Sequence, residues 1–125
     1  MTASTILIVD DSPSIRQTIT SVLCGAGYKT LEAVDGQDAL DRLSELGGPI
    51  ALAIVDINMP RLDGIALVRQ LRRAEPSRYI PILMLTAETR RERREEARQA
   101  GATGWIVKPF AVEEVLALVQ RLLRR

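Results

Sequence analysis

The chain is predicted to fold as a doubly wound α/β domain, in which helices cover both faces of one parallel sheet. Two observations predict this fold. Short apolar runs alternate with segments whose apolar residues recur at helical spacing, through five successive units. Reactive polar residues directly follow four of the apolar runs, namely Asp10 and Asp11, Asp56, Thr86 and Lys108. Because ligands bind outside the carboxyl ends of the strands in such a sheet, the same pattern predicts where the functional site lies.

The first strand–helix unit carries the clearest boundary signals. Residues 6–9 form a continuous apolar run, which is typical of a strand buried on both faces. Ser12 and Pro13 then supply an N-cap and a first-turn proline for a helix that ends at Gly25 and Gly27. The pattern predicts a central strand followed directly by a helix.

The second and third units contain Asp-Gly pairs where their helices begin. Residues 28–33 form a more polar strand, expected near an edge of the sheet, and Asp35-Gly36 leads into a helix that ends at 47–49. Residues 50–55 form another buried strand, and Asp63-Gly64 begins the third helix. We interpret both Asp-Gly pairs as structural turns.

The last two units differ in the apolar surface that their helices offer. A fourth strand is predicted over 80–85, and the helix over 90–100 offers only alanines to a core, so we expect it to move easily. Within this helix, the i,i+4 spacing predicts an ion pair between Arg91 and Glu95. After a short fifth strand, the final helix over 111–125 has two adjacent apolar stripes, which indicates either a broad inner face or a partner-binding surface.

Composition excludes several classes of function. The chain has no histidine, which removes Ser-His-Asp hydrolysis, histidine-ligated zinc and any role as a phosphohistidine donor. The net charge of +1 does not indicate nucleic-acid binding, and no apolar run is long enough to cross a bilayer. There is no N-terminal leader pattern and Cys24 is the only cysteine, so we expect a cytoplasmic protein with a buried free thiol.

The predicted edge of the sheet collects three carboxylates, one hydroxyl and one ammonium. Asp10, Asp11 and Asp56 would repel one another strongly in a partly dry cleft, so we expect a cation there. Oxygen ligands without histidine or cysteine suit Mg²⁺, which keeps several waters and accepts phosphate as a further ligand. With Mg²⁺ and Lys108 present, the charges of the site sum to zero. An aspartate in such a site is a competent nucleophile for phosphoryl transfer.

These residues stand in motifs that resemble the receiver domain of response regulators, of the stand-alone CheY-like type used in chemotaxis. The matching segments are Ile8-Val9-Asp10-Asp11-Ser12, Asp35-Gly36, Val55-Asp56-Ile57-Asn58-Met59-Pro60, Leu62-Asp63-Gly64, Leu85-Thr86-Ala87 and GATGWIVKPF over 101–110. The resemblance covers about residues 6–123 and is specific as an ordered set. It implies a flavodoxin-like, five-stranded parallel sheet of order 2-1-3-4-5 with five helices, formed by one receiver domain over 1–125.

The resemblance implies roles for the catalytic residues. Asp56 would be the phosphorylated residue. Lys108 would pair with the phosphoryl group, and Thr86 would hydrogen-bond to it. The Lys108–Pro109 peptide bond is expected to be cis, which the tertiary amide of proline makes accessible.

The resemblance also implies a ligand set for the expected cofactor, Mg²⁺. Asp11 and Asp56 would bind the ion directly, and the backbone carbonyl of Asn58 would be a third protein ligand. Asp10 would act mainly through water.

Three further positions correspond to switch and partner residues of the family. Glu88, together with Asn58, matches the positions that tune spontaneous dephosphorylation, and Ala87 belongs to the switch and partner surface. Trp105 occupies the position of the aromatic switch residue, which turns inward on activation. That residue is usually Tyr or Phe, and the larger indole carries an N–H that needs a partner when buried. This departure leaves open whether Trp105 swings inward.

The implied function is a phosphorylation-activated signalling switch of a two-component system, in chemotaxis or in a phosphorelay. A histidine kinase or phosphotransfer protein would donate the phosphoryl group in trans. The signal would pass to a downstream protein through the face made by the fourth helix, the fifth strand and the fifth helix, and a flagellar motor switch, a phosphorelay protein and a phosphate sink are all candidate outputs. We expect no catalysis beyond the chain's own phosphorylation and dephosphorylation, no binding to nucleic acid, no membrane insertion, and a monomer that can dimerise on phosphorylation.

Three other functions fit parts of the pattern. A Mg²⁺-dependent phosphatase with an aspartyl nucleophile needs an acid two residues later, where this chain has Asn58, and it usually carries a cap domain. A receiver-like scaffold that only binds proteins would not need the complete acidic site. A flavin-binding domain would place its phosphate in the first strand–helix loop, where Asp10 and Asp11 would repel it.

Overall fold

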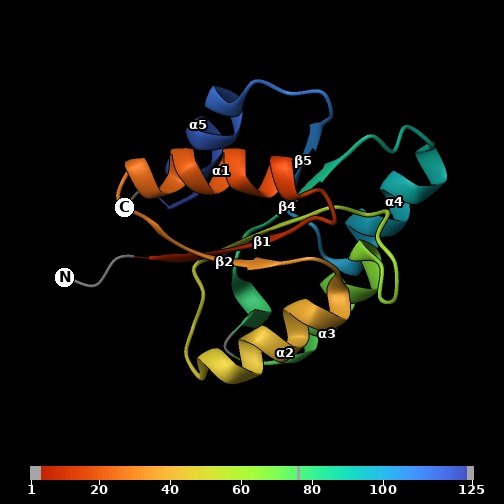
Figure 1. The fold of residues 1–125 in the computed structure, drawn as a ribbon. Coiled ribbons are helices and arrows are strands. Elements are labelled where there is room, and N and C mark those ends of the chain that lie inside the picture. Colours follow the sequence, from red (N-terminus) through yellow and green to blue (C-terminus); the bar gives the residue numbers. More distant parts are fainter. Residues whose placement is uncertain (1–3, 76, 124–125) are drawn as a thin grey trace.

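Figure 1 shows one sheet of parallel strands with helices on both of its faces. This computed structural model describes residues 4–75 and 77–123. The strands are β1 (Thr5–Val9), β2 (Lys29–Ala33), β3 (Leu52–Val55), β4 (Ile82–Thr86) and β5 (Gly104–Val107), in the order β2-β1-β3-β4-β5. The helices are α1 (Pro13–Gly25), α2 (Gly36–Leu46), α3 (Gly64–Arg73), α4 (Arg91–Ala100) and α5 (Val112–Leu123), and a short 3₁₀ helix, η1 (Ser77–Tyr79), precedes β4. The predicted fold class, strand order and edge position of β2 are confirmed.

The core has two halves, one on each face of the sheet. Leu7 and Val9 of β1 pack into the half that α2 and α3 cover, whereas Ile6 and Ile8 pack into the half that α1 and α5 cover. Successive side chains of a strand point to opposite faces, so a strand buried on both faces needs an apolar residue at every position. This requirement explains why β1 is a continuous apolar run.

Short polar side chains cap the helices that lead away from the functional edge. Asp35 accepts a hydrogen bond from the backbone N–H of Asp38 at 2.8 Å, and Asp63 accepts one from Ala66 at 2.9 Å. Ser12 caps α1 in the same way. The two Asp-Gly pairs, predicted as turns, therefore also satisfy free N–H groups at the helix N-termini.

The two C-terminal helices are held very differently. Ala97 is the only fully buried residue of α4, so this helix contributes little to the core, as predicted. Members of both apolar stripes of α5 pack against the core, with Val115 and Val119 buried. The stripes thus form one broad inner face. The last residues of the predicted helix, 124–125, lie outside the described residues.

Three sequence predictions need correction. Cys24 is exposed rather than buried, because it follows the inward-facing Leu23 by one position, which turns its side chain about 100° away around α1. Strand β4 begins at Ile82 rather than at residue 80, since η1 and Pro81 occupy the preceding positions. Strand β3 likewise begins later than predicted, at Leu52.

Among the described residues, none of the helices has the length and apolar character needed to span a bilayer.

Candidate functional site

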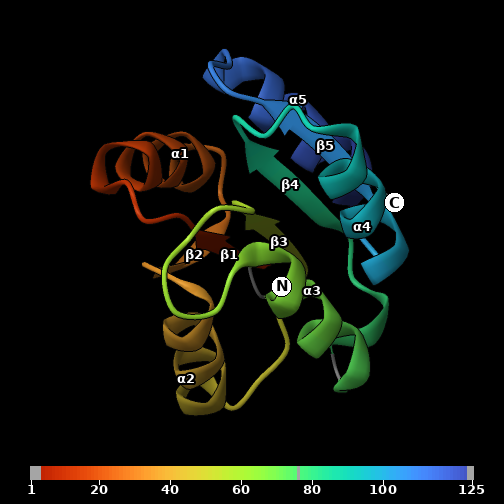
Figure 2. The ribbon, with the colours of Figure 1, turned by 90° about the vertical axis from the view of Figure 1, so that its right-hand side faces the viewer.

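The site lies at the carboxyl edge of the sheet, which Figure 2 faces. Hydrogen bonds continue the strand pairing just beyond the strands: the N–H of Asp56 donates to Val9 O at 3.0 Å, and that of Lys108 donates to Thr86 O at 3.0 Å. The N–H of Asp10 likewise donates to Ala33 O at 3.2 Å. Sheet pairing therefore sets the relative positions of the reactive residues before any side-chain contact forms.

Three carboxylates converge at this edge. Asp10, Asp11 and Asp56 each place one carboxylate oxygen within 4.8 Å of the others. Asp10 and Asp56 are buried, at 1% and 6% exposure, and Asp11 is exposed. The predicted acidic cluster is therefore present, with two acids in the interior and one at its mouth.

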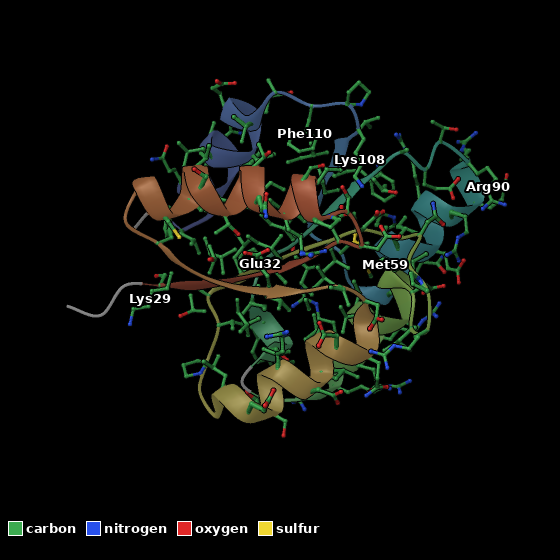
Figure 3. The ribbon with its side chains drawn as sticks, viewed as in Figure 1. Lys29, Glu32, Met59, Arg90, Lys108 and Phe110 are labelled. Atoms are coloured by element: carbon green, nitrogen blue, oxygen red, sulfur yellow. The ribbon has the colours of Figure 1, made fainter. Side chains whose placement is uncertain are left out.

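Lys108 compensates part of this negative charge. Its Nζ lies 2.8 Å from Asp10 Oδ2 and 2.9 Å from Asp56 Oδ2. Burial alone would lower the pKa of Lys108, but the two carboxylates together raise it, so the ammonium stays charged. Figure 3 shows Lys108 toward the same end of the sheet as Met59 of the β3–α3 loop, and toward the opposite end from Lys29 at the start of β2.

The buried Asp10 carboxylate remains incompletely satisfied. Its Oδ1 accepts a hydrogen bond from the Ser12 N–H at 2.9 Å, but Oδ2 accepts no well-aligned hydrogen bond despite the nearby ammonium. Burial raises the pKa of Asp10, and Lys108 opposes that shift only in part. The three carboxylates of the cluster carry more negative charge than the single Lys108 ammonium can offset.

The donor set fits a hard divalent cation. The oxygens of Asp10, Asp11 and Asp56 are close enough to share one ion, and such an ion would give Asp10 Oδ2 a partner in addition to the poorly aligned Lys108 ammonium. The N–H of Asn58 approaches Asp56 Oδ1 at 3.3 Å, so Asn58 lies next to the cluster. Oxygen ligands of this kind suit Mg²⁺.

Thr86 is fully buried beside the acids, at the end of β4. Its Oγ1 accepts a hydrogen bond from the Glu88 N–H at 3.1 Å, which leaves the hydroxyl proton free to be donated. Ala87, between them, is exposed at the surface. The structure therefore places Thr86 at the carboxyl end of β4, with a hydroxyl proton that is available to a new acceptor.

Glu88 is held by a partner that sequence reasoning missed. Arg90 donates to its carboxylate from Nε at 2.9 Å and from Nη2 at 3.0 Å, and the backbone N–H of Arg90 also donates to it at 2.9 Å. The Arg90 guanidinium lowers the pKa of Glu88 to about 2. Glu88 is therefore anchored to the start of α4, where Figure 3 shows Arg90.

Trp105 is partly buried and packs against the half of the core that α2 and α3 cover. The guanidinium of Arg94 lies over its ring, 4.9 Å from the centroid. The indole N–H is buried and has no hydrogen-bond partner among the described residues. The sequence indicated that a buried indole N–H needs a partner, but it predicted neither the lack of one in this structure nor the stacking of Arg94.

Three residues that support the site had no assigned role. A Cβ on Gly64 would lie 1.9 Å from the carbonyl oxygen of Asp56, so only glycine fits there. Arg61 binds Asp35 at 2.8 Å and 3.0 Å, which joins the β3–α3 loop to the start of α2. Arg16 donates to the backbone carbonyl of Asp10. The Asp-Gly pair signals the need for Gly64, but no local pattern signals the arginines.

Fold and site together define a doubly wound domain with a cluster of three acids and one lysine at the carboxyl edge of its sheet. The family model of the response regulator receiver domain matches residues 6–120. The chain therefore belongs to the response regulator receiver family and works in phosphorylation-activated two-component signalling. The cis Lys108–Pro109 peptide bond, which the resemblance implied, is also present.

Comparison with known proteins agrees with this assignment. The chain is 39% identical over 121 residues to chemotaxis protein CheY-3 of Vibrio cholerae, covering 96% of this chain and 92% of that protein. It is 42% identical over 120 residues to response regulator MprA of Mycobacterium avium, covering 96% of this chain and 51% of MprA. The solved structure of Vibrio cholerae CheY4 matches with a TM-score of 0.89 at 41% identity, covering 98% of this chain and all of that one. Receiver domains bind Mg²⁺ at an acidic pocket such as the one described above.

Proposed function

We propose that Asp56 accepts the phosphoryl group. The observation that carries this proposal is the contact of 2.9 Å between Asp56 Oδ2 and Lys108 Nζ inside a cluster of acids. An Asp56 oxygen attacks the phosphorus of a phosphohistidine in line, the new P–O bond forms, and the P–N bond to the donor imidazole breaks. The ammonium of Lys108 then pairs with a phosphoryl oxygen. Such a reaction needs positioning and charge neutralisation rather than further covalent chemistry.

Asp10, Asp11, Asp56 and the backbone carbonyl of Asn58 would hold Mg²⁺ in this site. The ion supplies positive charge to the phosphoryl oxygens when it is bound. The close approach of three carboxylate oxygens supports this ligand set. Because the chain has no histidine, the donor is a separate histidine kinase or phosphotransfer protein.

Phosphorylation would be communicated through Thr86. Its free hydroxyl proton can be donated to a phosphoryl oxygen, and a shift of Thr86 toward the phosphoryl group would pull on Glu88, whose N–H donates to the Thr86 hydroxyl. Glu88 is tied to Arg90 at the start of α4, so this movement reaches a helix that has only one fully buried residue. We propose that α4, β5 with Trp105, and α5 form the output surface for a downstream protein.

The relatives suggest the setting of this switch. Similarity to chemotaxis proteins over almost their whole length supports a stand-alone receiver domain over 1–125, acting in chemotaxis or a phosphorelay. Identity to MprA, of which the chain matches about half, is 42%, slightly above the 39% identity to CheY-3, so sequence identity does not by itself favour one output over another. The only catalysis that the proposal requires is phosphorylation and dephosphorylation of the chain itself.

Labelling with radioactive acetyl phosphate in the presence of Mg²⁺ tests the proposal. We expect wild-type protein to incorporate label, Asp56→Asn to incorporate none, and EDTA to remove the labelling of wild type. Asp41→Asn is the matched control, because Asp41 is an exposed acid on α2, and it should label as wild type does. Undiminished labelling of Asp56→Asn would reject the assignment, and turnover of phosphate esters would favour the phosphatase alternative.

A further inference from the structure

A second site lies between α4 and β5, away from the acidic pocket. The cavity there has a volume of about 640 Å³, and its polar lining consists of Arg91, Arg94, Glu95, Arg98, Thr103 and Trp105. None of these residues belongs to the acid cluster. Cavities of roughly 300–1,000 Å³ accommodate small organic ligands.

The arginines of this region differ in whether they have an acidic partner. Three of the five are paired: Arg90 with Glu88, Arg93 with Glu96 and Asp63, and Arg98 with Glu95. The expected Arg91–Glu95 pair does not form, because Glu95 binds Arg98 instead. Within residues 4–75 and 77–123, no carboxylate oxygen lies within 4.0 Å of Arg91 or Arg94, and both of these arginines line the cavity.

The cavity therefore carries two positive charges that the described residues do not balance. The charges of Arg98 and Glu95 offset each other in their ion pair. Arg91 and Arg94 lie three positions apart on α4, so they occupy the same face of the helix. Two guanidinium groups on one face can converge on a single anionic group. A phosphoryl group presents several charged oxygens on one atom and matches the guanidinium fork, whereas the carboxylates of a peptide are spaced along a chain.

A stacked pair of planar groups, the Arg94 guanidinium and the Trp105 indole, also lines the cavity. The Arg94 guanidinium lies over the Trp105 indole, and Arg94 Nε and Trp105 Nε1 are both buried without hydrogen-bond partners among the described residues. Buried donors without acceptors are uncommon in folded proteins. Both atoms lie beneath the surface of the cavity, so an acceptor oxygen of a ligand would reach them only if the Arg94 and Trp105 side chains shift.

We propose that the cavity between α4 and β5 binds a phosphate-bearing small molecule with at least two negative charges, held by Arg91 and Arg94 beside Trp105. Because α4 contributes little to the core, such a ligand would fix this helix and Trp105 in the arrangement seen here. Binding here does not depend on phosphorylation of Asp56. The molecule would then regulate the same surface that the switch uses.

Fluorescence titration tests this site directly, because Trp105 is the only tryptophan. The protein is titrated in EDTA with pyrophosphate and, separately, with ADP, and calorimetry checks each binding constant. We expect saturable binding that Arg91→Gln weakens about tenfold, the loss expected for a charge-assisted hydrogen-bonded contact. The exposed Arg121 of α5 supplies the matched control, Arg121→Gln, which should bind as wild type does.

The two probes distinguish the source of the phosphate. Tighter binding of ADP indicates a nucleotide whose base stacks in the cavity, and equal binding indicates a diphosphate recognised by charge alone. Absence of binding by both probes, or equal affinity in wild type and Arg91→Gln, would overturn the proposal. Asp56→Asn should lose labelling by acetyl phosphate and retain pyrophosphate binding, so the two proposals fail independently. Binding that Asp56→Asn abolishes would place the anion in the acidic pocket and reject this second site.

Discussion

Gly64 lies against the backbone of Asp56, and we expect it to tolerate no side chain. A Cβ at this position would lie 1.9 Å from Asp56 O, 2.7 Å from Asp56 C and 2.8 Å from Ile57 Cα. All three atoms belong to backbone that strand pairing and the Gly64 N–H bond to Ile57 O hold in place. Because no flexible side chain can give way, Gly64→Ala must push the β3–α3 loop away from α3.

The expected decrease in the free energy of unfolding follows from that overlap. Overpacking of a rigid interior typically costs about 1–3 kcal/mol, and a clash with backbone belongs at the upper end, about 3 kcal/mol. For a domain of this size with a urea m-value of roughly 2 kcal/mol per molar, the unfolding midpoint should fall by about 1.5 M. The same shift displaces Asp56, so the folded fraction of Gly64→Ala should also label more slowly with acetyl phosphate.

Equilibrium unfolding in urea, followed by far-UV circular dichroism, measures this change. Gly48→Ala is the control, because a Cβ at Gly48 meets nothing within 4 Å, and its midpoint should stay near that of wild type. A Gly64→Ala midpoint within about 0.2 M of wild type, together with wild-type labelling, would show that the loop is not pinned by this contact.

Three further predictions use charge. Lys108→Met removes the ammonium that competes with a metal ion for Asp10 and Asp56, so the affinity for Mg²⁺ should rise while phosphorylation becomes slower. Electron paramagnetic resonance with Mn²⁺ in place of Mg²⁺ measures the metal affinity, and weaker metal binding by the variant would contradict this prediction. The pKa of Glu88 is lowered to about 2 from 4.5, so its pair with Arg90 stabilises the fold fully above about pH 5 and loses that effect as the pH falls toward 2. The difference in unfolding midpoint between wild type and Glu88→Gln should shrink over that range, and a constant difference would exclude the pair as its cause. Arg61→Ala leaves a buried acid without its partner and should lower the urea midpoint more than Arg42→Ala, which breaks an exposed i,i+4 pair; equal effects would show that the loop clamp is unimportant.

Local patterns were sufficient to predict the fold and the place of the site. The apolar run of β1 indicates burial on both faces, and the positions of Asp10, Asp56 and Lys108 directly after their strands predict that they meet. Parallel pairing brings the ends of neighbouring strands to one edge whatever the details of the packing. For that reason the sequence predicted that Lys108 and Asp56, 52 residues apart, gather at one edge, whereas their direct contact across the width of β4 is seen only in the structure.

The features missed from sequence have a common cause. Cys24 was assigned to the interior because it is the only cysteine and a reducing cytoplasm was expected, but the face of α1 that points inward is set by Ile19 and Leu23. The pair of Arg91 with Glu95 was inferred from helical spacing, yet Glu95 pairs with Arg98. Each of these outcomes depends on how a helix is rotated or on which of several nearby rotamers is adopted.

The sequence by itself determined the alternating strands and helices, the edge at which the reactive groups gather and the chemistry that those groups can perform. Only the tertiary structure decided which residues support that chemistry. Arg61 binds Asp35, which lies 26 positions away in the sequence. Gly64 has no side chain, and the Asp56 carbonyl occupies the position that a Cβ would take. Strand and helix periodicity is a local property of the backbone, so it can be read along the chain. The partner of a long arginine side chain, and the room beside a glycine, depend on distances between elements that are set only when those elements pack.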